Sequence, residues 1–300
     1  MTTHDGSNAK GVADTPMIDA RNLRVDFATK RGVVSAVRGI SFTLGREKLA
    51  IVGESGSGKS MTGRAIMKLL PETARVSADR LAFHDLDLLS AGEEQMTHIR
   101  GRRIGLIMQD PKYSLNPVVA VGDQIGEAYL LHNPGWKGRH EVREHTLAML
   151  ESVKIRDPSR VARLYPHEVS GGMGQRIMIA MMLVAKPEVL IADEPTSALD
   201  VTVRLEVLAL LDELITEKGM GLILISHDLN LVGRFCDRVL IMYAGQILET
   251  CKAAELSLAR HPYTRGLLSS LPSILNRKSR LPTLVRDPAW STPLSGHPDA

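Results

Sequence analysis

The sequence has few cysteines and no long apolar run. Two cysteines, Cys236 and Cys251, are too few for a disulfide framework or a zinc site, and two free thiols fit a reducing cytosol. The longest apolar run, 177–185, ends at Lys186 and Pro187. A helix that spans a bilayer needs roughly 20 apolar residues, so we expect that the chain does not cross a membrane by itself.

A secretion signal and a basic block are also missing. The first residues have no apolar core behind a basic start and no small-residue cleavage site, so we expect residues 1–16 to form a disordered leader. The formal net charge is only +3 and is not concentrated in one segment. This charge distribution gives no reason to expect a nucleic-acid partner.

Two kinds of apolar pattern predict two kinds of strand. Between Met17 and Val52 apolar residues alternate with polar ones, as expected for strands of a half-exposed sheet. Short and nearly continuous apolar runs, which are typical of strands buried on both faces of a parallel sheet, occur at Leu49–Val52, Ile104–Met108, Val189–Ala192, Leu222–Ile225 and Val239–Tyr243.

Helical segments separate these runs. The clearest is Val203–Ile215, in which Leu205 and Leu208 begin an apolar face at helical spacing. The segment 111–184 has no comparable strand pattern, so we expect a helical insertion into an α/β core. After about Pro262 the periodicity ends and prolines and basic residues increase, which predicts a poorly packed tail.

The first buried run leads into a glycine-rich loop. Gly53-Glu54-Ser55-Gly56-Ser57-Gly58-Lys59-Ser60 fits the P-loop pattern between a strand and a helix, and Met61 completes the predicted binding set. In such a loop the backbone N–H groups surround phosphates, Lys59 reaches the β and γ phosphates, and the Ser60 hydroxyl binds Mg²⁺. The alternative is a plain glycine-rich turn with an exposed lysine. The polar residues that follow the other apolar runs favour the P-loop.

Three more runs end in polar side chains that suit the same chemistry. Asp193 and Glu194 follow one run, and an acidic pair there can hold Mg²⁺ and polarise an attacking water. Gln109 follows another and could ligate the metal or orient water, and His227 follows the last and could contact a γ-phosphate. Each of these residues alone is more often a capped strand end or a structural histidine. Together they predict one site, because parallel strands end at the same edge of a sheet.

Several motifs resemble the ATP-binding subunits of ABC transporters over about residues 17–272. Tyr165-Pro166-His167-Glu168-Val169-Ser170-Gly171-Gly172-Met173 is similar to the ABC signature, Asp193-Glu194-Pro195-Thr196-Ser197-Ala198-Leu199-Asp200 to Walker B with the D-loop, and Ile225-Ser226-His227-Asp228 to the switch-histidine motif. The resemblance implies a RecA-like P-loop NTPase core with an N-terminal antiparallel β subdomain. It also implies that Glu194 is the general base and that Ser170, Gly171 and Gly172 close on ATP held by another subunit.

Two further segments resemble the oligopeptide, dipeptide and nickel importers. These are Gln109-Asp110-Pro111 with the following Ser114-Leu115-Asn116-Pro117, and His261-Pro262-Tyr263-Thr264-Arg265-Gly266-Leu267-Leu268. The resemblance implies an ABC ATPase domain over residues 17–261, a helical subdomain over about 92–186, and an importer-type extension over 262–300.

The same resemblance implies partners and a location. The expected partners are a second ATPase subunit, usually a different chain, two membrane-spanning permease subunits and an external solute-binding protein. The expected location is peripheral, on the cytoplasmic face of the plasma (inner) membrane. Lys112 and Tyr113 lie where relatives contact the permease, although a solvated loop is an equally plain interpretation. The cargo, whether peptide or nickel complex, stays open.

The chain departs from the family pattern at several positions. Val169 replaces the usual leucine and Gly174 the usual arginine beside the signature. The aromatic residue that would stack on adenine is unassigned, with Phe27 the nearest candidate. The tail after Leu271 has no cysteine, whereas many relatives have a cysteine-rich tail, so we expect no iron–sulfur cluster.

Two other function classes share part of this pattern. A non-transport ABC ATPase acting on DNA or ribosomes would have the same catalytic motifs, but such proteins usually carry two cassettes or a long coiled coil, and this chain has one P-loop and no sustained heptads. A P-loop kinase would have no use for the signature motif. The sequence therefore favours a transport ATPase.

Overall fold

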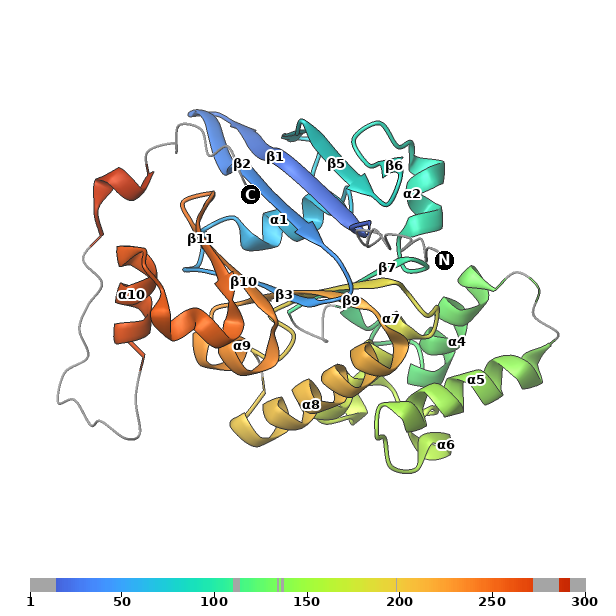
Figure 1. The fold of residues 1–300 in the computed structure, drawn as a ribbon. Coiled ribbons are helices and arrows are strands. Elements are labelled where there is room, and N and C mark those ends of the chain that lie inside the picture. Colours follow the sequence, from blue (N-terminus) through green and yellow to red (C-terminus); the bar gives the residue numbers. More distant parts are fainter. Residues whose placement is uncertain are drawn as a thin grey trace, which may run out of the picture.

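The computed structural model describes residues 15–109, 114–133, 135, 138–197, 199–271 and 286–291. Their strands form two sheets that face each other across α1 (Lys59–Ile66), as Figure 1 shows. All but the last two residues of the expected leader lie outside the described part of the chain.

The larger sheet is the core of the fold and has the strand order β11-β10-β3-β9-β8-β7. Its members are β3 (Lys48–Val52), β7 (Ile104–Ile107), β8 (Val189–Asp193), β9 (Gly221–Ser226), β10 (Arg238–Tyr243) and β11 (Gln246–Lys252). Neighbouring strands are parallel except for β11, which is antiparallel to β10. The five continuous apolar runs are therefore confirmed as strands of a parallel sheet, and their carboxyl ends lie at one edge.

The smaller sheet is antiparallel and contains the alternating segments near the N-terminus. Its members are β1 (Ile18–Thr29), β2 (Gly32–Leu44), β4 (Ala74–Ser77), β5 (Arg80–Phe83) and β6 (Leu86–Asp87). Successive side chains of a strand point to opposite faces of the sheet, so the larger sheet packs against a different hydrophobic cluster on each face. Leu49 and Ile51 of β3 join the cluster beneath the antiparallel sheet, whereas Ala50 and Val52 join the cluster on the opposite face.

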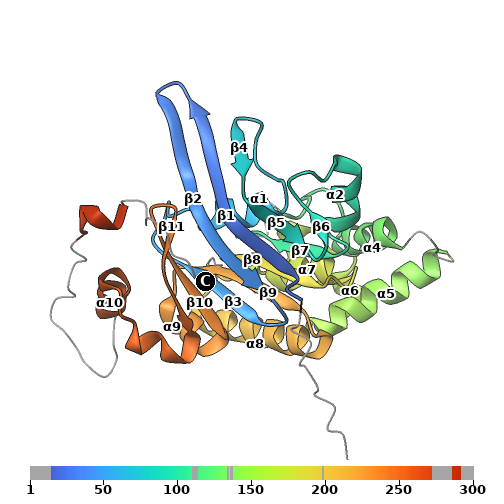
Figure 2. The ribbon, with the colours of Figure 1, turned by 45° about the horizontal axis from the view of Figure 1, so that its top comes forward.

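Helices cover that opposite face (Figure 2). Those of the core and its insertion are α4 (Val121–His132), α5 (Arg139–Ser152), α6 (Pro158–Val161), α7 (Gly171–Leu183), α8 (Val201–Lys218) and α9 (Leu229–Phe235). The remaining helical elements are α2 (Glu93–Ile99), α10 (Pro262–Ser269) and the short 3-10 turns η1 (Pro166–Glu168), η2 (Ala253–Leu258) and η3 (Pro288–Ser291). None of the described helices combines the length and apolarity that crossing a bilayer requires.

Three details differ from the sequence-based expectations. Leu205 is 62% exposed, because it lies on the face of α8 opposite to that of the buried Val207 and Leu214. The range 92–186 expected for the helical subdomain also contains β7, which belongs to the parallel sheet, and α2, whose Met96 packs beneath the antiparallel sheet.

The third difference concerns the tail. The prediction of poor packing is wrong for residues 262–271, because they begin with a helix whose Tyr263 and Thr264 are fully buried. A helix of eight residues is too short for its apolar spacing to stand out in the sequence. Cysteine at 236 and at 251 is free and half-buried, as expected.

Candidate active site

The P-loop connects β3 to α1, and its glycines are required by close backbone packing. A Cβ atom on Gly53 would lie 2.0 Å from the Met242 carbonyl oxygen, and one on Gly58 would lie 2.3 Å from the Ala36 carbonyl oxygen. Gly58 also has φ +103°, which side chains rarely adopt, and it is the residue before the first turn of α1. The loop is therefore held in a shape that leaves the N-terminus of α1 open toward a ligand.

Lys59 is buried under this loop and hydrogen-bonds to its backbone. Its Nζ donates to the carbonyl oxygens of Gly53 at 2.9 Å and of Glu54 at 2.8 Å, and only 6% of the residue is exposed. Burial lowers the pKa of this ammonium group, and the nearby carboxylates of Glu194 and Asp193 oppose that shift. The ammonium group thus has carbonyl partners that a phosphate can replace.

Ser60, in the first turn of α1, contacts Asp193 at the end of β8. The Ser60 hydroxyl donates to Oδ1 of Asp193 at 2.9 Å. Burial raises the pKa of the Asp193 carboxyl, while the Ser60 hydrogen bond and the charge of Arg64 act in the opposite direction. A hydroxyl and a carboxylate beside a P-loop are ligands of the kind that Mg²⁺ prefers.

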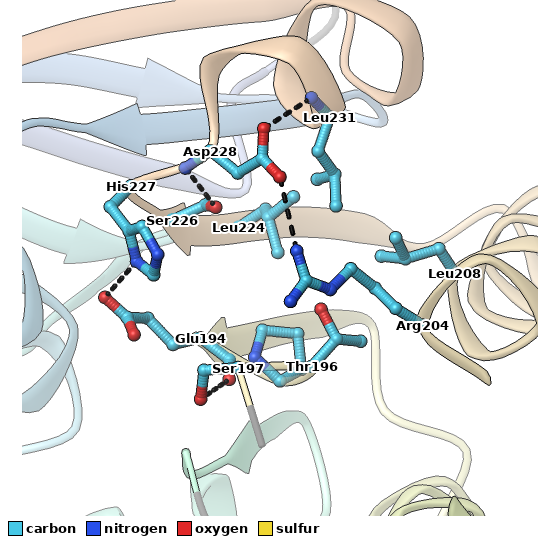
Figure 3. Close-up of a pocket in the computed structure, with 11 residues that line it drawn as sticks. Glu194, Thr196, Ser197, Arg204, Leu208, Leu224, Ser226, His227, Asp228 and Leu231 are labelled. Carbon is cyan, nitrogen blue, oxygen red and sulfur yellow. Dashed lines mark hydrogen bonds and ion pairs between the residues drawn. The ribbon is translucent and has the colours of Figure 1, made fainter. Parts of the chain in front are cut away.

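Glu194 is the centre of a second group of contacts (Figure 3). Its Oε2 accepts a hydrogen bond from Nε2 of Gln109 at 3.2 Å, and its Oε1 lies 3.1 Å from Nδ1 of His227. Its φ of +48° is in the left-handed region, which is uncommon for a residue with a side chain. The backbone N–H of Glu194 donates to the Ile225 carbonyl at 2.9 Å, which helps to hold this conformation. The three residues expected at these strand ends therefore meet at one carboxylate.

The turn that carries His227 is fixed by its neighbour Asp228. The backbone N–H of Asp228 donates to the Ser226 hydroxyl at 3.0 Å, and its carboxylate caps α9 by accepting from the Leu231 N–H at 3.1 Å. Arg204 of α8 reaches the same carboxylate at 3.4 Å (Figure 3). The cavity beneath this turn measures only about 20 Å³, enough for a single water, so the turn is packed rather than open.

The signature segment begins α7. The Ser170 hydroxyl accepts a hydrogen bond from the Met173 N–H at 3.3 Å and so caps the helix, a role that serine commonly has at a helix start. A Cβ on Gly172 would lie 2.6 Å from Cγ1 of Val203, so a glycine is needed where α7 meets α8. Ser170 and Gly171 are exposed. Among the described residues, no hydrogen bond or ion pair joins residues 170–172 to the P-loop group.

The described residues give little support to the expectations for adenine stacking and for contact with the permease. Phe27 is half-buried against the core and pairs in register with Val34, which is 56% exposed, so the adenine-stacking residue stays unassigned. Lys112 and Tyr113 lie outside the described residues. In the described part of the chain no three His, Cys, Asp or Glu side chains are arranged to hold a metal ion.

The loop residues fit a phosphate group. The Ser57 hydroxyl is buried and has no hydrogen-bond partner within the described structure, which is costly unless a ligand supplies one. The buried ammonium group of Lys59 belongs to the same loop region as the Ser57 hydroxyl. The glycines there lack the Cβ atoms that would prevent this loop shape. These features suit a nucleotide with its accompanying cation.

Two residues in contact with the P-loop were not predicted as part of the site. The hydroxyl of Tyr263 accepts a hydrogen bond from the Glu54 N–H at 3.2 Å, and Arg286 forms an ion pair with the Glu54 carboxylate at 2.9 Å. Both follow the P-loop by more than 200 positions in the chain. Only the short helix start at Pro262 could have indicated that Tyr263 is packed.

The fold and the site define a class. A P-loop between a core strand and α1, with a hydroxyl, two carboxylates, a glutamine and a histidine at neighbouring strand ends, is the arrangement of a P-loop nucleotide hydrolase. A sequence model of the family described as "ABC transporter" matches residues 37–197. This chain belongs to the ABC transporter family, as an ATPase subunit.

Relatives agree with this assignment. The dipeptide transport ATP-binding protein DppD of Bacillus subtilis is 44% identical over 288 residues, which cover 95% of this chain and 85% of that protein. A probable peptide ABC transporter ATP-binding protein, y4tR of Sinorhizobium fredii, is 46% identical over 89% of this chain and 81% of its own length. The dimeric ATP-binding cassette MJ0796, solved with ADP and Pi in a post-hydrolysis state, matches with a TM-score of 0.67 and 27% identity over 79% of this chain and 99% of that one.

Proposed function

We propose that this chain hydrolyses ATP to drive the uptake of peptides, or of a related small solute such as a nickel complex, through membrane subunits that are separate chains. The observation that carries the proposal is the set of contacts at Glu194, where residues from three strand ends meet beside the P-loop. The names of the relatives support a peptide as cargo.

Each residue has a role in this proposal. The carboxylate of Glu194 accepts a proton from the attacking water, and His227 and Gln109 orient that carboxylate and the γ-phosphate. Lys59 exchanges its carbonyl partners for phosphate oxygens and offsets the charge that develops there. Ser60, Asp193 and Gln109 would hold Mg²⁺, which when bound neutralises phosphate charge. Backbone N–H groups within residues 53–61 surround the phosphates, except that of Glu54, which donates to the Tyr263 hydroxyl.

A second ATPase subunit is part of the proposal. Ser170, Gly171 and Gly172 open a helix whose free N–H groups suit an anion, yet they form no hydrogen bond or ion pair with the P-loop group among the described residues. Exposed Val201 and Leu205 lie at the start of α8, which packs beside the signature. We take this apolar pair and the signature together as the surface that meets the P-loop of the partner.

Two permease subunits and an external solute-binding protein complete the assembly, at the cytoplasmic face of the inner membrane. The helical insertion offers a groove of about 610 Å³ lined by residues of α4, α5 and the segment around α6. Asp123 and Glu127 on one wall and Arg139 and Arg143 on the other give it charges of both signs. We assign this groove to a segment of the permease, because α4 follows the Gln109 loop closely in the chain.

Co-expression with candidate permease subunits tests the proposal. In proteoliposomes, the complex should hydrolyse ATP faster when the solute-binding protein and a peptide are present, and uptake should require ATP. Tagged chain should carry the membrane subunits with it on purification. Co-purification of nucleic acid or ribosomes instead, with no membrane subunit, would contradict the transport function and favour the alternative of a non-transport ABC ATPase acting on DNA or ribosomes.

A further inference from the structure

The P-loop residue Glu54 is held by two residues that follow it by more than 200 positions in the chain. Tyr263, in the first turn of α10, is fully buried and accepts the Glu54 N–H at 3.2 Å. The His261 ring caps α10 by accepting the Tyr263 N–H at 3.1 Å, so the start of this helix is fixed. Burial raises the pKa of Tyr263 to about 12, so its hydroxyl stays neutral at physiological pH.

The segment 286–290 reaches the same glutamate from farther along the chain. Arg286 donates to the Glu54 carboxylate through Nη2 at 2.9 Å and Nε at 3.4 Å. Trp290 lies edge-on to the rings of Tyr263, Tyr243 and His261, with centroids 5.7, 6.1 and 5.9 Å away. Edge-to-face aromatic contacts stabilise a structure beyond the effect of the apolar area that they bury. Residues 286–290 are therefore packed against these rings.

All three polar parts of Glu54 therefore have partners. Its N–H donates to Tyr263, its carbonyl accepts from Lys59, and its carboxylate accepts from Arg286. Without Arg286, a carboxylate in the first turn of the P-loop would face an incoming polyanion with its full charge. Without the Tyr263 hydroxyl, the peptide group that positions the carbonyl partner of Lys59 would lose its support.

We propose that the C-terminal extension braces the P-loop, with Tyr263 and Arg286 acting as positioning residues for nucleotide binding. Tyr263 fixes the Glu54 peptide, and Arg286 neutralises the Glu54 carboxylate where it would repel ATP. Within the described structure neither residue forms a hydrogen bond or ion pair with Glu194 or His227, so the brace acts on binding and leaves the hydrolytic step alone. The proposal relies on ATP being bound at this P-loop.

A double-mutant cycle in the full chain tests the charge component. Binding of a fluorescent ATP analogue and of ADP is measured for wild type, Arg286→Gln, Glu54→Gln and the double variant. Because Arg286 is 63% exposed and the pair is partly screened, we expect Arg286→Gln to weaken ATP binding about two- to fivefold. The loss should be smaller in the Glu54→Gln background, and Arg286→Lys should keep most of the affinity.

Kinetics and a matched control separate positioning from a general structural effect. In the assembled transporter, Arg286→Gln and Tyr263→Phe should raise KM for ATP two- to fivefold and leave kcat within about twofold. Arg265→Gln, which removes an exposed arginine from α10, should change neither. Emission of Trp290, isolated in a Trp136→Phe background, should shift to longer wavelength in Arg286→Glu if the segment leaves its aromatic neighbours.

The possible outcomes are distinct. If Arg286→Gln and Tyr263→Phe bind ATP as wild type does, or weaken it no more than Arg265→Gln, the brace is refuted while the ATPase function stands. An additive cycle would refute the charge role of Arg286. If wild-type chain binds no ATP, the proposed function itself fails, and that result is visible before any variant is compared.

Discussion

The P-loop side and the signature side of the chain are built in opposite ways. On the P-loop side, Lys59 is buried and the side chains of neighbouring strand ends already hydrogen-bond to one another. On the signature side, Ser170 caps its own helix and faces outward. One chain thus assembles the side chains around the P-loop, whereas its signature segment is exposed. In the proposed function, folding alone prepares the first half of the site and association with a second subunit completes it.

The largest effect is expected on the P-loop side. Lys59→Ala removes the ammonium group that faces the phosphates, so ATP turnover in the assembled transporter should fall about 10²–10³-fold. The fold should survive, because the variant loses only two hydrogen bonds to loop carbonyls, and the Glu54 carbonyl still accepts from the Ser57 N–H. Phosphate release measures turnover, and Lys252→Ala, at a lysine with a 77% exposed side chain, serves as the control. Wild-type turnover in Lys59→Ala would contradict the P-loop role.

A change on the signature side should act only through association. Ser170→Arg places a bulky cation where we expect a partner subunit, so turnover of the assembled complex should fall at least about tenfold. Binding of an ATP analogue to the isolated chain should stay unchanged, because Ser170 makes no hydrogen bond to the P-loop group among the described residues. If Ser170→Arg also weakens analogue binding to the isolated chain, the signature influences the P-loop of its own chain, and the proposed separation of the two sides is wrong.

Glycine substitutions compare the rigidity of the two sides. Gly53→Ala places a Cβ 2.0 Å from a backbone oxygen, which cannot move away cheaply, and should cost about 3 kcal/mol or more in the free energy of unfolding. At Gly171 the nearest atom, Cδ2 of Leu199, would be 3.9 Å away, so Gly171→Ala should cost less than about 1 kcal/mol. Urea unfolding of both variants measures the difference, and equal costs would contradict the comparison.

The smallest expected effect concerns the charge of Asp193. Its pKa is raised above the usual 3.8, so ionising it costs more in the folded than in the unfolded chain. Stability therefore falls as the pH rises through the raised pKa, and the cost is present above that pKa. Asp193→Asn removes the charge and should raise the Tm of the nucleotide-free chain by on the order of 2 °C at pH 7. The gain should vanish well below pH 3.8, and a lower Tm at pH 7 would contradict this reasoning.

The core and the phosphate side were predictable because their signals are local. Each buried run is a short apolar block, and four of the five lead directly or after one residue into the site. The parallel sheet therefore brings Gln109, Glu194 and His227 to one edge. The helix cap at Ser170 is equally local, since its partner is only three residues away.

What escaped prediction depends on contacts between distant segments. Nothing near Tyr263 or Arg286 in the sequence indicates that both reach Glu54, because the contact depends on how the tail folds back. The exposure of Leu205 has a different origin, since its spacing from Leu208 fits one helix face, yet the residue lies on the side of α8 that faces away from the buried Val207 and Leu214.

Light scattering of Glu194→Gln tests the central claim most directly. This near-isosteric change removes the carboxylate that accepts the proton from water and leaves Asp193 in place, so ATP should bind without being hydrolysed. The variant with its partner ATPase subunit should accumulate as a dimer in Mg-ATP and separate in Mg-ADP, because bound ligand stabilises only the state that binds it. Adding Ser170→Arg should abolish the dimer. Equal masses in both nucleotides, together with normal turnover by Glu194→Gln, would contradict both the general-base role and the shared site.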